Sequence, residues 1–132
     1  MNSKTFFWPV RVYYEDTDSG GVVYYANYLK FFERARTEWL RSFGLNQDKL
    51  AREQGLIFVV RRALLDFVRP ARLDDMLELT VEPLKLARVY VDLVQEARSG
   101  AQLLARAEIR VACLNLRNFK PVAIPQLLRD VL

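Results

Sequence analysis

Three carboxylates and a pair of glycines lie close together near the start of the chain. Glu15, Asp16 and Asp18 precede the glycines, and an amphipathic segment follows directly. A carboxylate can act as a general base on water or as a nucleophile. Glycines let the backbone approach a ligand closely, and the first turn of a helix presents unpaired N–H groups to an oxygen that becomes negative. The stretch 13–28 is therefore predicted to be a catalytic corner.

The three carboxylates compete for the catalytic role. Acidic residues before a helix often serve only to cap the loop or to complement the helix dipole, and for two of the three this is the simpler interpretation. Asp18 lies nearest the glycine pair and the expected helix. It is therefore the best placed of the three to face a group held by helical N–H donors.

The residues that are absent narrow the chemistry further. The chain contains no histidine, which excludes Ser–His and Cys–His nucleophilic catalysis within one chain. Its one cysteine, Cys113, falls in an apolar series at strand spacing and is expected to be a buried small hydrophobe. Hydrolysis must then use carboxylates, lysine, hydroxyls or backbone dipoles, with no cofactor and no metal expected.

Length and composition indicate a globular enzyme or binding protein. The 132 residues are expected to form one domain, 1–132, with 52% hydrophobic and 27% charged residues. No apolar run approaches the roughly 18 residues that cross a bilayer, and no signal peptide is recognisable, so a cytoplasmic location is expected. The net charge of +4 alone fits nucleic acid and a phosphorylated small molecule such as coenzyme A equally well, and most of the arginines are expected only to solvate the surface. Nucleic acid is a weaker candidate and is not expected, because the cations are scattered and no recognised motif is present.

One long helix is predicted over Val22–Phe43, with a length of roughly 33 Å at 1.5 Å per residue. Apolar side chains recur there at steps of three and four. This stripe consists of Tyr25, Tyr28, Leu29, Phe32, Ala35, Trp39 and Phe43. Gly44 follows, where a left-handed C-terminal cap is expected.

Five strands are predicted from alternating and β-branched segments. They span Phe6–Glu15, Leu56–Arg69, Met76–Leu86, Arg88–Ala97 and Gln102–Leu114. The last three form an antiparallel meander, and Pro70 is expected to end the second strand or to place a bulge there. Short helices are predicted from Asn46 or Asp48 through Arg52, ended by Gly55, and over Ile124–Leu132.

These elements predict an α+β fold, in which one antiparallel sheet carries one helix across a face. A single helix covers only one face of the sheet, whereas the strand Leu56–Arg69 is apolar on both sides. Part of that strand is therefore expected to lie in a subunit interface.

The segment from Tyr14 to Tyr28 resembles the active-site signature of hotdog-fold acyl-CoA thioesterases of the 4-hydroxybenzoyl-CoA thioesterase superfamily. Phe32–Glu38 and Pro70–Asp75 are typical of its Tol-Pal-associated (YbgC-type) branch. The resemblance spans nearly the whole chain. It implies a hotdog fold, a five-stranded antiparallel sheet wrapped around one long central α-helix. The implied activity is hydrolysis of a short aliphatic or aromatic acyl-CoA to free acid and CoA.

The resemblance also implies roles for particular residues. Asp18 would be either the general base or the nucleophile, and the backbone N–H of Tyr25 would polarise the thioester carbonyl. The YbgC-type branch often has histidine at this position, whereas tyrosine is similar to the hydroxybenzoyl-CoA enzymes. Tyrosine titrates near pH 10, so only the backbone of Tyr25 is expected to take part near neutral pH.

Further residues are expected to contact the substrate. Candidates for the acyl pocket are Tyr14, Gly21, Val59 and Val60, and candidates for the CoA phosphates are Arg61, Arg62 and Arg88. Arginine suits phosphate because its planar fork of donors matches the anion. Ordinary strand packing of Tyr14 and a solvated strand edge for the arginines are the alternatives.

The resemblance implies a homodimer, paired further into a homotetramer, in which Leu56–Arg69 continues the partner's sheet. An acyl carrier protein is a second candidate partner, because carrier proteins are typically acidic and this chain is basic. The alternative function is a non-catalytic module that binds acyl-CoA or an acyl carrier protein.

Overall fold

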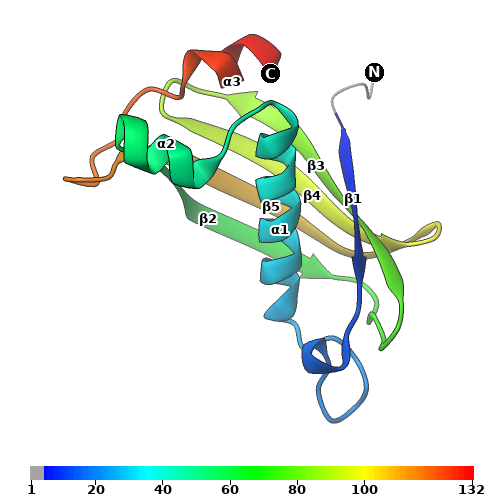
Figure 1. Ribbon diagram of the computed structural model, residues 1–132. Coiled ribbons are helices and arrows are strands. Elements are labelled where there is room, and N and C mark those ends of the chain that lie inside the picture. Colours follow the sequence, from blue (N-terminus) through cyan, green and yellow to red (C-terminus); the bar gives the residue numbers. More distant parts are fainter. Residues whose placement is uncertain (1–4) are drawn as a thin grey trace.

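The computed structural model describes residues 5–132, and it shows one antiparallel sheet with helix α1 across one face (Figure 1). The elements in order are β1 (Phe6–Arg11), a 3₁₀ turn (Tyr14–Asp16), α1 (Asn27–Ser42), α2 (Gln47–Gln54), β2 (Leu56–Phe67), β3 (Met76–Leu86), β4 (Tyr90–Ser99), β5 (Gln102–Asn115) and α3 (Gln126–Val131). The predicted α+β fold is confirmed. Within these residues, no helix is both long enough and apolar enough to cross a membrane.

The strand order is β1-β3-β4-β5-β2, so β3, β4 and β5 form the predicted meander. The two edges of the sheet differ. β2 has 12 residues and pairs only with β5, which leaves its other side open. β1 at the opposite edge has six residues and contains Pro9, which carries no N–H donor.

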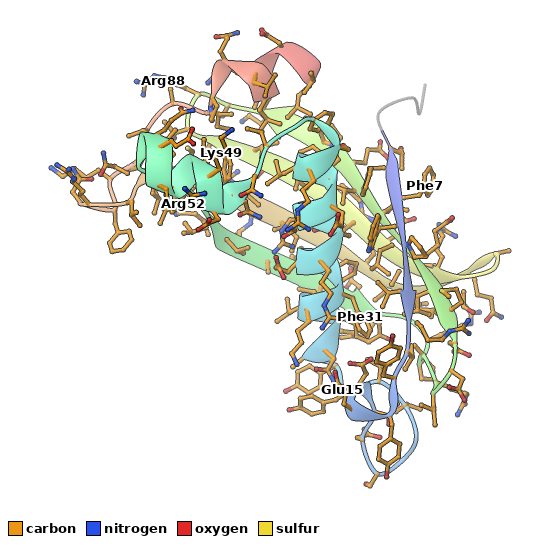
Figure 2. All side chains as sticks on the ribbon, viewed as in Figure 1. Phe7, Glu15, Phe31, Lys49, Arg52 and Arg88 are labelled. Carbon is orange, nitrogen blue, oxygen red and sulfur yellow. The ribbon has the colours of Figure 1, made fainter. Side chains whose placement is uncertain are left out.

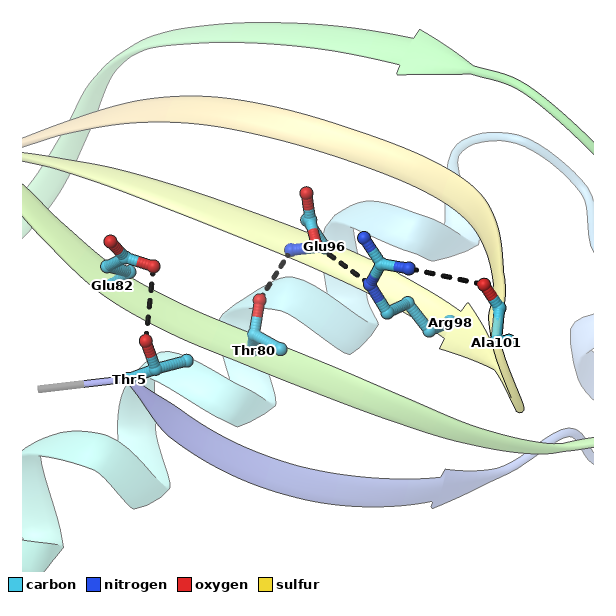
Figure 3. Close-up of polar contacts among 6 residues, drawn as sticks. All are labelled: Thr5, Thr80, Glu82, Glu96, Arg98 and Ala101. Atoms are coloured by element: carbon cyan, nitrogen blue, oxygen red, sulfur yellow. Dashed lines mark hydrogen bonds and ion pairs between the residues drawn. The ribbon is translucent and has the colours of Figure 1, made fainter. Parts of the chain in front are cut away.

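Side chains between the strands add to the backbone ladder (Figure 3). Thr80 Oγ1 on β3 accepts a hydrogen bond of 3.0 Å from the backbone N–H of Glu96 on β4. The Glu96 carboxylate in turn accepts a bond of 2.9 Å from Arg98 Nε. The first of these contacts links β3 to β4, whereas the second lies within β4.

The core lies between α1 and the inner face of the sheet. The buried residues of α1 are Tyr28, Phe31, Phe32, Ala35, Trp39 and Leu40. The predicted stripe is wrong at Tyr25, which precedes α1 and is exposed, and at Leu29, which is exposed although its neighbour Tyr28 is buried. Cys113 is fully buried as predicted, and burial raises the pKa of its thiol to about 11.

The first two predicted elements are too long. α1 begins at Asn27 instead of Val22, because Val22 and Val23 form isolated bridges with Arg72 and Thr17. The helix therefore has 16 residues and a length of about 24 Å. The first strand ends at Arg11 instead of Glu15, since residues 14–16 turn into a 3₁₀ helix.

The predicted ends of α1 and α2 are confirmed. Gly44 and Gly55 both have positive φ, at 85° and 65°, so each can close the preceding helix where a side chain would be strained. Asn46 Oδ1 caps α2 by accepting a hydrogen bond from Lys49 N at 2.9 Å.

Three boundaries differ from the prediction along the second half of the chain. β2 ends at Phe67 instead of Arg69, three residues before Pro70, and its bulge lies between Val60 and Arg62. β4 begins at Tyr90, two residues after Arg88, and α3 is limited to Gln126–Val131.

Candidate active site

Asp16 holds the acidic loop together. Its side chain is only 4% exposed, and Asp16 Oδ2 accepts a hydrogen bond of 2.8 Å from Tyr13 N. Its carbonyl oxygen accepts bonds from Tyr24 N at 3.1 Å and from Asn27 Nδ2 at 2.8 Å. Asp16 thus joins the start of the loop to the first residue of α1, which is a structural role.

Asp18 has the opposite environment. It is exposed, and its backbone forms a tight turn through Asp18 N to Val22 O at 2.9 Å and Gly21 N to Asp18 O at 3.0 Å. Asp18 Oδ1 accepts a hydrogen bond of 2.9 Å from Gly20 N, whereas Oδ2 has no hydrogen-bond partner among residues 5–132. One carboxylate oxygen is therefore oriented and the other is open to a reactant.

Both glycines are required by this turn. A Cβ atom on Gly20 would lie 3.3 Å from Asp18 Oδ1, which is tighter than an ordinary contact. Gly21 has φ of 78°, a conformation that favours glycine. The structure thus assigns Gly21 a place in the turn that presents Asp18.

Two backbone donors are open at the start of α1. The carbonyls of Tyr24, Tyr25 and Ala26 accept the first bonds of the helical turn, from Asn27, Tyr28 and Leu29. The N–H groups of Tyr25 and Ala26 donate to no other residue in the described part of the chain. Tyr25 lies before the N-cap Ala26, so its N–H is a free donor just ahead of the first helical turn and not one within it.

Buried Tyr28 anchors this end of the helix. Its hydroxyl accepts a hydrogen bond of 3.2 Å from Ala71 N, and burial raises its pKa. Its ring centroid lies 5.6 Å from that of Phe67 at the end of β2, and the Tyr25 ring lies 5.8 Å from the same Phe67. The three aromatic rings border an open depression of about 290 Å³ beside the loop.

The other predicted pocket residues are dispersed in a single subunit. Tyr14 is 84% exposed and belongs to the 3₁₀ turn, so the alternative of strand packing is wrong. Val59 is half-buried and Val60 is 47% exposed, both on β2. Val60 lines a cavity under the second half of α1, whereas Tyr25 lies before its first residue.

Of the three predicted arginines, Arg88 lies apart from Arg61 and Arg62, which are consecutive on β2. Arg61 is exposed in the bulge of β2, and the charge of Arg62 contributes, after Arg110, to the lowered pKa of Asp92. Arg88 lies at the end of the molecule near α3, where its carbonyl accepts a hydrogen bond of 2.6 Å from Arg129 Nη2. Figure 2 shows Arg88 at the opposite end of the molecule from Glu15 of the acidic loop.

The sequence analysis missed one candidate functional residue, the partly buried Arg36. Arg36 lies on the inner side of α1 and lines the cavity that Val60 also lines. The periodicity of the helix does not single out Arg36, because its hydrogen bond to Gln95 of β4 joins residues 59 positions apart in the sequence.

The sheet with α1 across one face has the hotdog architecture, and proteins that share it include thioesterases. The sequence pattern of the thioesterase-like superfamily matches residues 12–132. "Acyl-CoA thioesterase YbgC" of Haemophilus influenzae is 46% identical over 126 residues, which cover 96% of this chain and 93% of the relative.

Solved structures of thioesterases have the same fold as this chain. A probable thioesterase from Bartonella henselae has a TM-score of 0.88 and 38% identity, covering 92% of this chain and 99% of that one. Slr0204, a 1,4-dihydroxy-2-naphthoyl-CoA thioesterase from Synechocystis, has a TM-score of 0.89 and 29% identity, with 96% and 93% covered. The chain belongs to the thioesterase-like superfamily. The predicted hotdog fold and the predicted enzyme class, thioester hydrolase, are confirmed.

Proposed function

We propose that this thioesterase hydrolyses acyl-CoA to a free acid and CoA, with Asp18 as the reacting carboxylate. The observation that carries the proposal is the open Oδ2 of Asp18 in a loop that leads directly to two open N–H groups, those of Tyr25 and Ala26. The names of the relatives, which include acyl-CoA and naphthoyl-CoA enzymes, support the same substrate class.

In this mechanism the thioester oxygen accepts hydrogen bonds from the Tyr25 and Ala26 N–H groups, which stabilise the negative charge that forms on it. Asp18 either removes a proton from the water that attacks the carbonyl carbon, or attacks that carbon itself to form a mixed anhydride that water then cleaves. In both cases the C–S bond breaks and the CoA thiolate leaves with the electron pair, to be protonated in solution.

The open edge of β2 supports a site shared by two subunits. Tyr25 packs on Phe67 at one end of β2, and Val60 lies toward the other end. If two copies of β2 pair in antiparallel fashion about a twofold axis, the first half of the partner's strand, which contains Val60, lies along the Phe67 end and so toward Tyr25. A homodimer then combines residues that are separate in one chain, and exposed Arg61 lies at the same seam to meet the CoA phosphates.

The decisive experiment compares wild type with Asp18→Asn on a panel of acyl-CoAs. Asparagine keeps the acceptor for Gly20 N but cannot act as base or nucleophile, so kcat/KM should fall by about 10²- to 10⁴-fold. Glu15→Gln is the matched control, because Glu15 is an exposed acid in the same loop, and it should keep the wild-type rate. Equal rates for wild type and Asp18→Asn would exclude Asp18 from the chemistry.

A further inference from the structure

A mostly apolar cavity of about 200 Å³ lies between α1 and the inner face of the sheet. Phe58 and Val60 of β2, Leu93 of β4 and Val111 of β5 form its apolar wall. Arg36 enters this wall from α1. A charged side chain in such surroundings is costly unless something compensates it.

Arg36 has few partners among the described residues. Its Nη1 donates a hydrogen bond of 3.0 Å to Gln95 Oε1, and Gln95 is fully buried, with its amide nitrogen bonded to the carbonyls of Phe32 and Thr80. The remaining donors of the guanidinium have no acceptor within residues 5–132. The ion pairs in that part of the chain all involve other arginines.

Glu33, the acidic residue at the same cavity, does not form an ion pair with Arg36. The carboxylate of Glu33, also at the cavity, accepts a hydrogen bond of 2.6 Å from Thr37 Oγ1, which is itself bonded by Gln47 Nε2 at 3.2 Å. Burial lowers the pKa of Arg36, and the charge of Glu33 offsets this effect only in part. An anion that entered the cavity would therefore balance the positive charge of Arg36, which has no ion-pair partner in the described part of the chain.

We propose that this cavity receives the acyl group of the substrate, and that Arg36 selects acyl groups that end in a carboxylate. The proposal rests on the thioesterase function proposed above and names its substrate class, the CoA half-thioesters of short dicarboxylic acids. Arg36 would bind the distal carboxylate with the donors that have no other acceptor, and a charge-assisted pair of this kind is among the stronger hydrogen bonds.

Size and position both fit this role. At the roughly 30 Å³ that a water molecule occupies, the cavity accepts about seven non-hydrogen atoms, and a glutaryl group has six beyond its thioester carbonyl. Arg36 is nine residues into α1, about 14 Å from the first residue of its own helix. The cavity would instead serve the Asp18 loop of the partner, because Val60 both lines the cavity and lies at the open edge of β2.

The test measures kcat/KM for glutaryl-CoA and for 5-methylhexanoyl-CoA, in which an isopropyl group replaces the carboxylate at equal atom count. Wild type should prefer glutaryl-CoA by about tenfold or more. Arg36→Met should reduce the glutaryl-to-methylhexanoyl ratio by about 10- to 100-fold, the range expected for losing a hydrogen bond to a charged group. Arg36→Lys, which keeps the charge, should recover part of the preference.

Arg34→Met is the matched control, because Arg34 is an exposed cation on the same helix and its loss should leave the ratio unchanged. Wild type that prefers 5-methylhexanoyl-CoA, or a folded Arg36→Met with the wild-type ratio, would overturn the proposal while leaving the thioesterase function intact. Failure to hydrolyse any acyl-CoA would overturn the proposed function itself. If Arg36→Met does not fold, two measurements on wild type still test the proposal. Its kcat/KM should be higher for glutaryl-CoA than for 5-methylhexanoyl-CoA, and free glutarate should inhibit it more strongly than free 5-methylhexanoate.

Discussion

Asp16 and Asp18, two acids of the same loop, have different physical roles. Asp16 is buried and bonded to backbone on both sides of the loop, whereas Asp18 is exposed with one open oxygen. The sequence indicated Asp18 through its place beside the glycines, but it could not show that Asp16 is structural. The Asp16 carboxylate bonds Tyr13 N, and it becomes buried only when the loop folds back so that Tyr24 and Asn27 bond the Asp16 carbonyl.

Asp16→Ala should lower the free energy of unfolding by about 1–3 kcal/mol, because the Tyr13 N–H loses its partly buried acceptor. Asp18→Ala, at an exposed site, should change stability by no more than about 0.5 kcal/mol. Urea unfolding monitored by tryptophan fluorescence measures both. Equal losses in the two variants would contradict the division of roles between them.

At the scale of elements, periodic segments were predicted well and irregular ones were not. Strands β3 and β5 and the capped helix α2 follow directly from alternation and from Asn46 and Gly55. The start of α1 was misplaced, because Val22 and Val23 are apolar enough to continue the helical pattern. They pair instead with residues 71–72, far away in the sequence, and no local signal reports that pairing.

A substitution on β2 tests whether this strand forms the proposed dimer contact. Leu64 is 56% exposed on this open-edged strand, where the proposed dimer would cover it. Leu64→Lys should weaken dimerisation on the order of 100-fold or more, because burying an unpaired charge costs several kcal/mol. Sedimentation velocity over a concentration series measures the effect.

Leu84→Lys is the control for this experiment. Leu84 is 62% exposed but lies on β3, away from the β2 edge, so the lysine should leave the dimer unaffected. Dissociation by both variants, or by neither, would show that the β2 edge is not the contact.

For the whole molecule, the proposed site exists only where two chains meet. Activity per chain should therefore disappear as the dimer dissociates, in step with the fraction of monomer. Light scattering and acyl-CoA hydrolysis, followed over the same dilution series, test this coupling. A fully active monomer would rule out a shared site.

The difference between the β1 and β2 edges of the sheet also determines whether assembly of subunits stops at a dimer or continues. If the open side of β2 joined the β1 edge of a neighbouring molecule, each addition would expose a fresh β2 edge, and the assembly would grow without limit into a fibre. β1 is half as long as β2, and Pro9 removes one of its donors, so it is a poor template for such growth. Pairing of β2 with a second β2 uses both open edges at once and closes the assembly. Pro9 would then protect this enzyme against polymerisation.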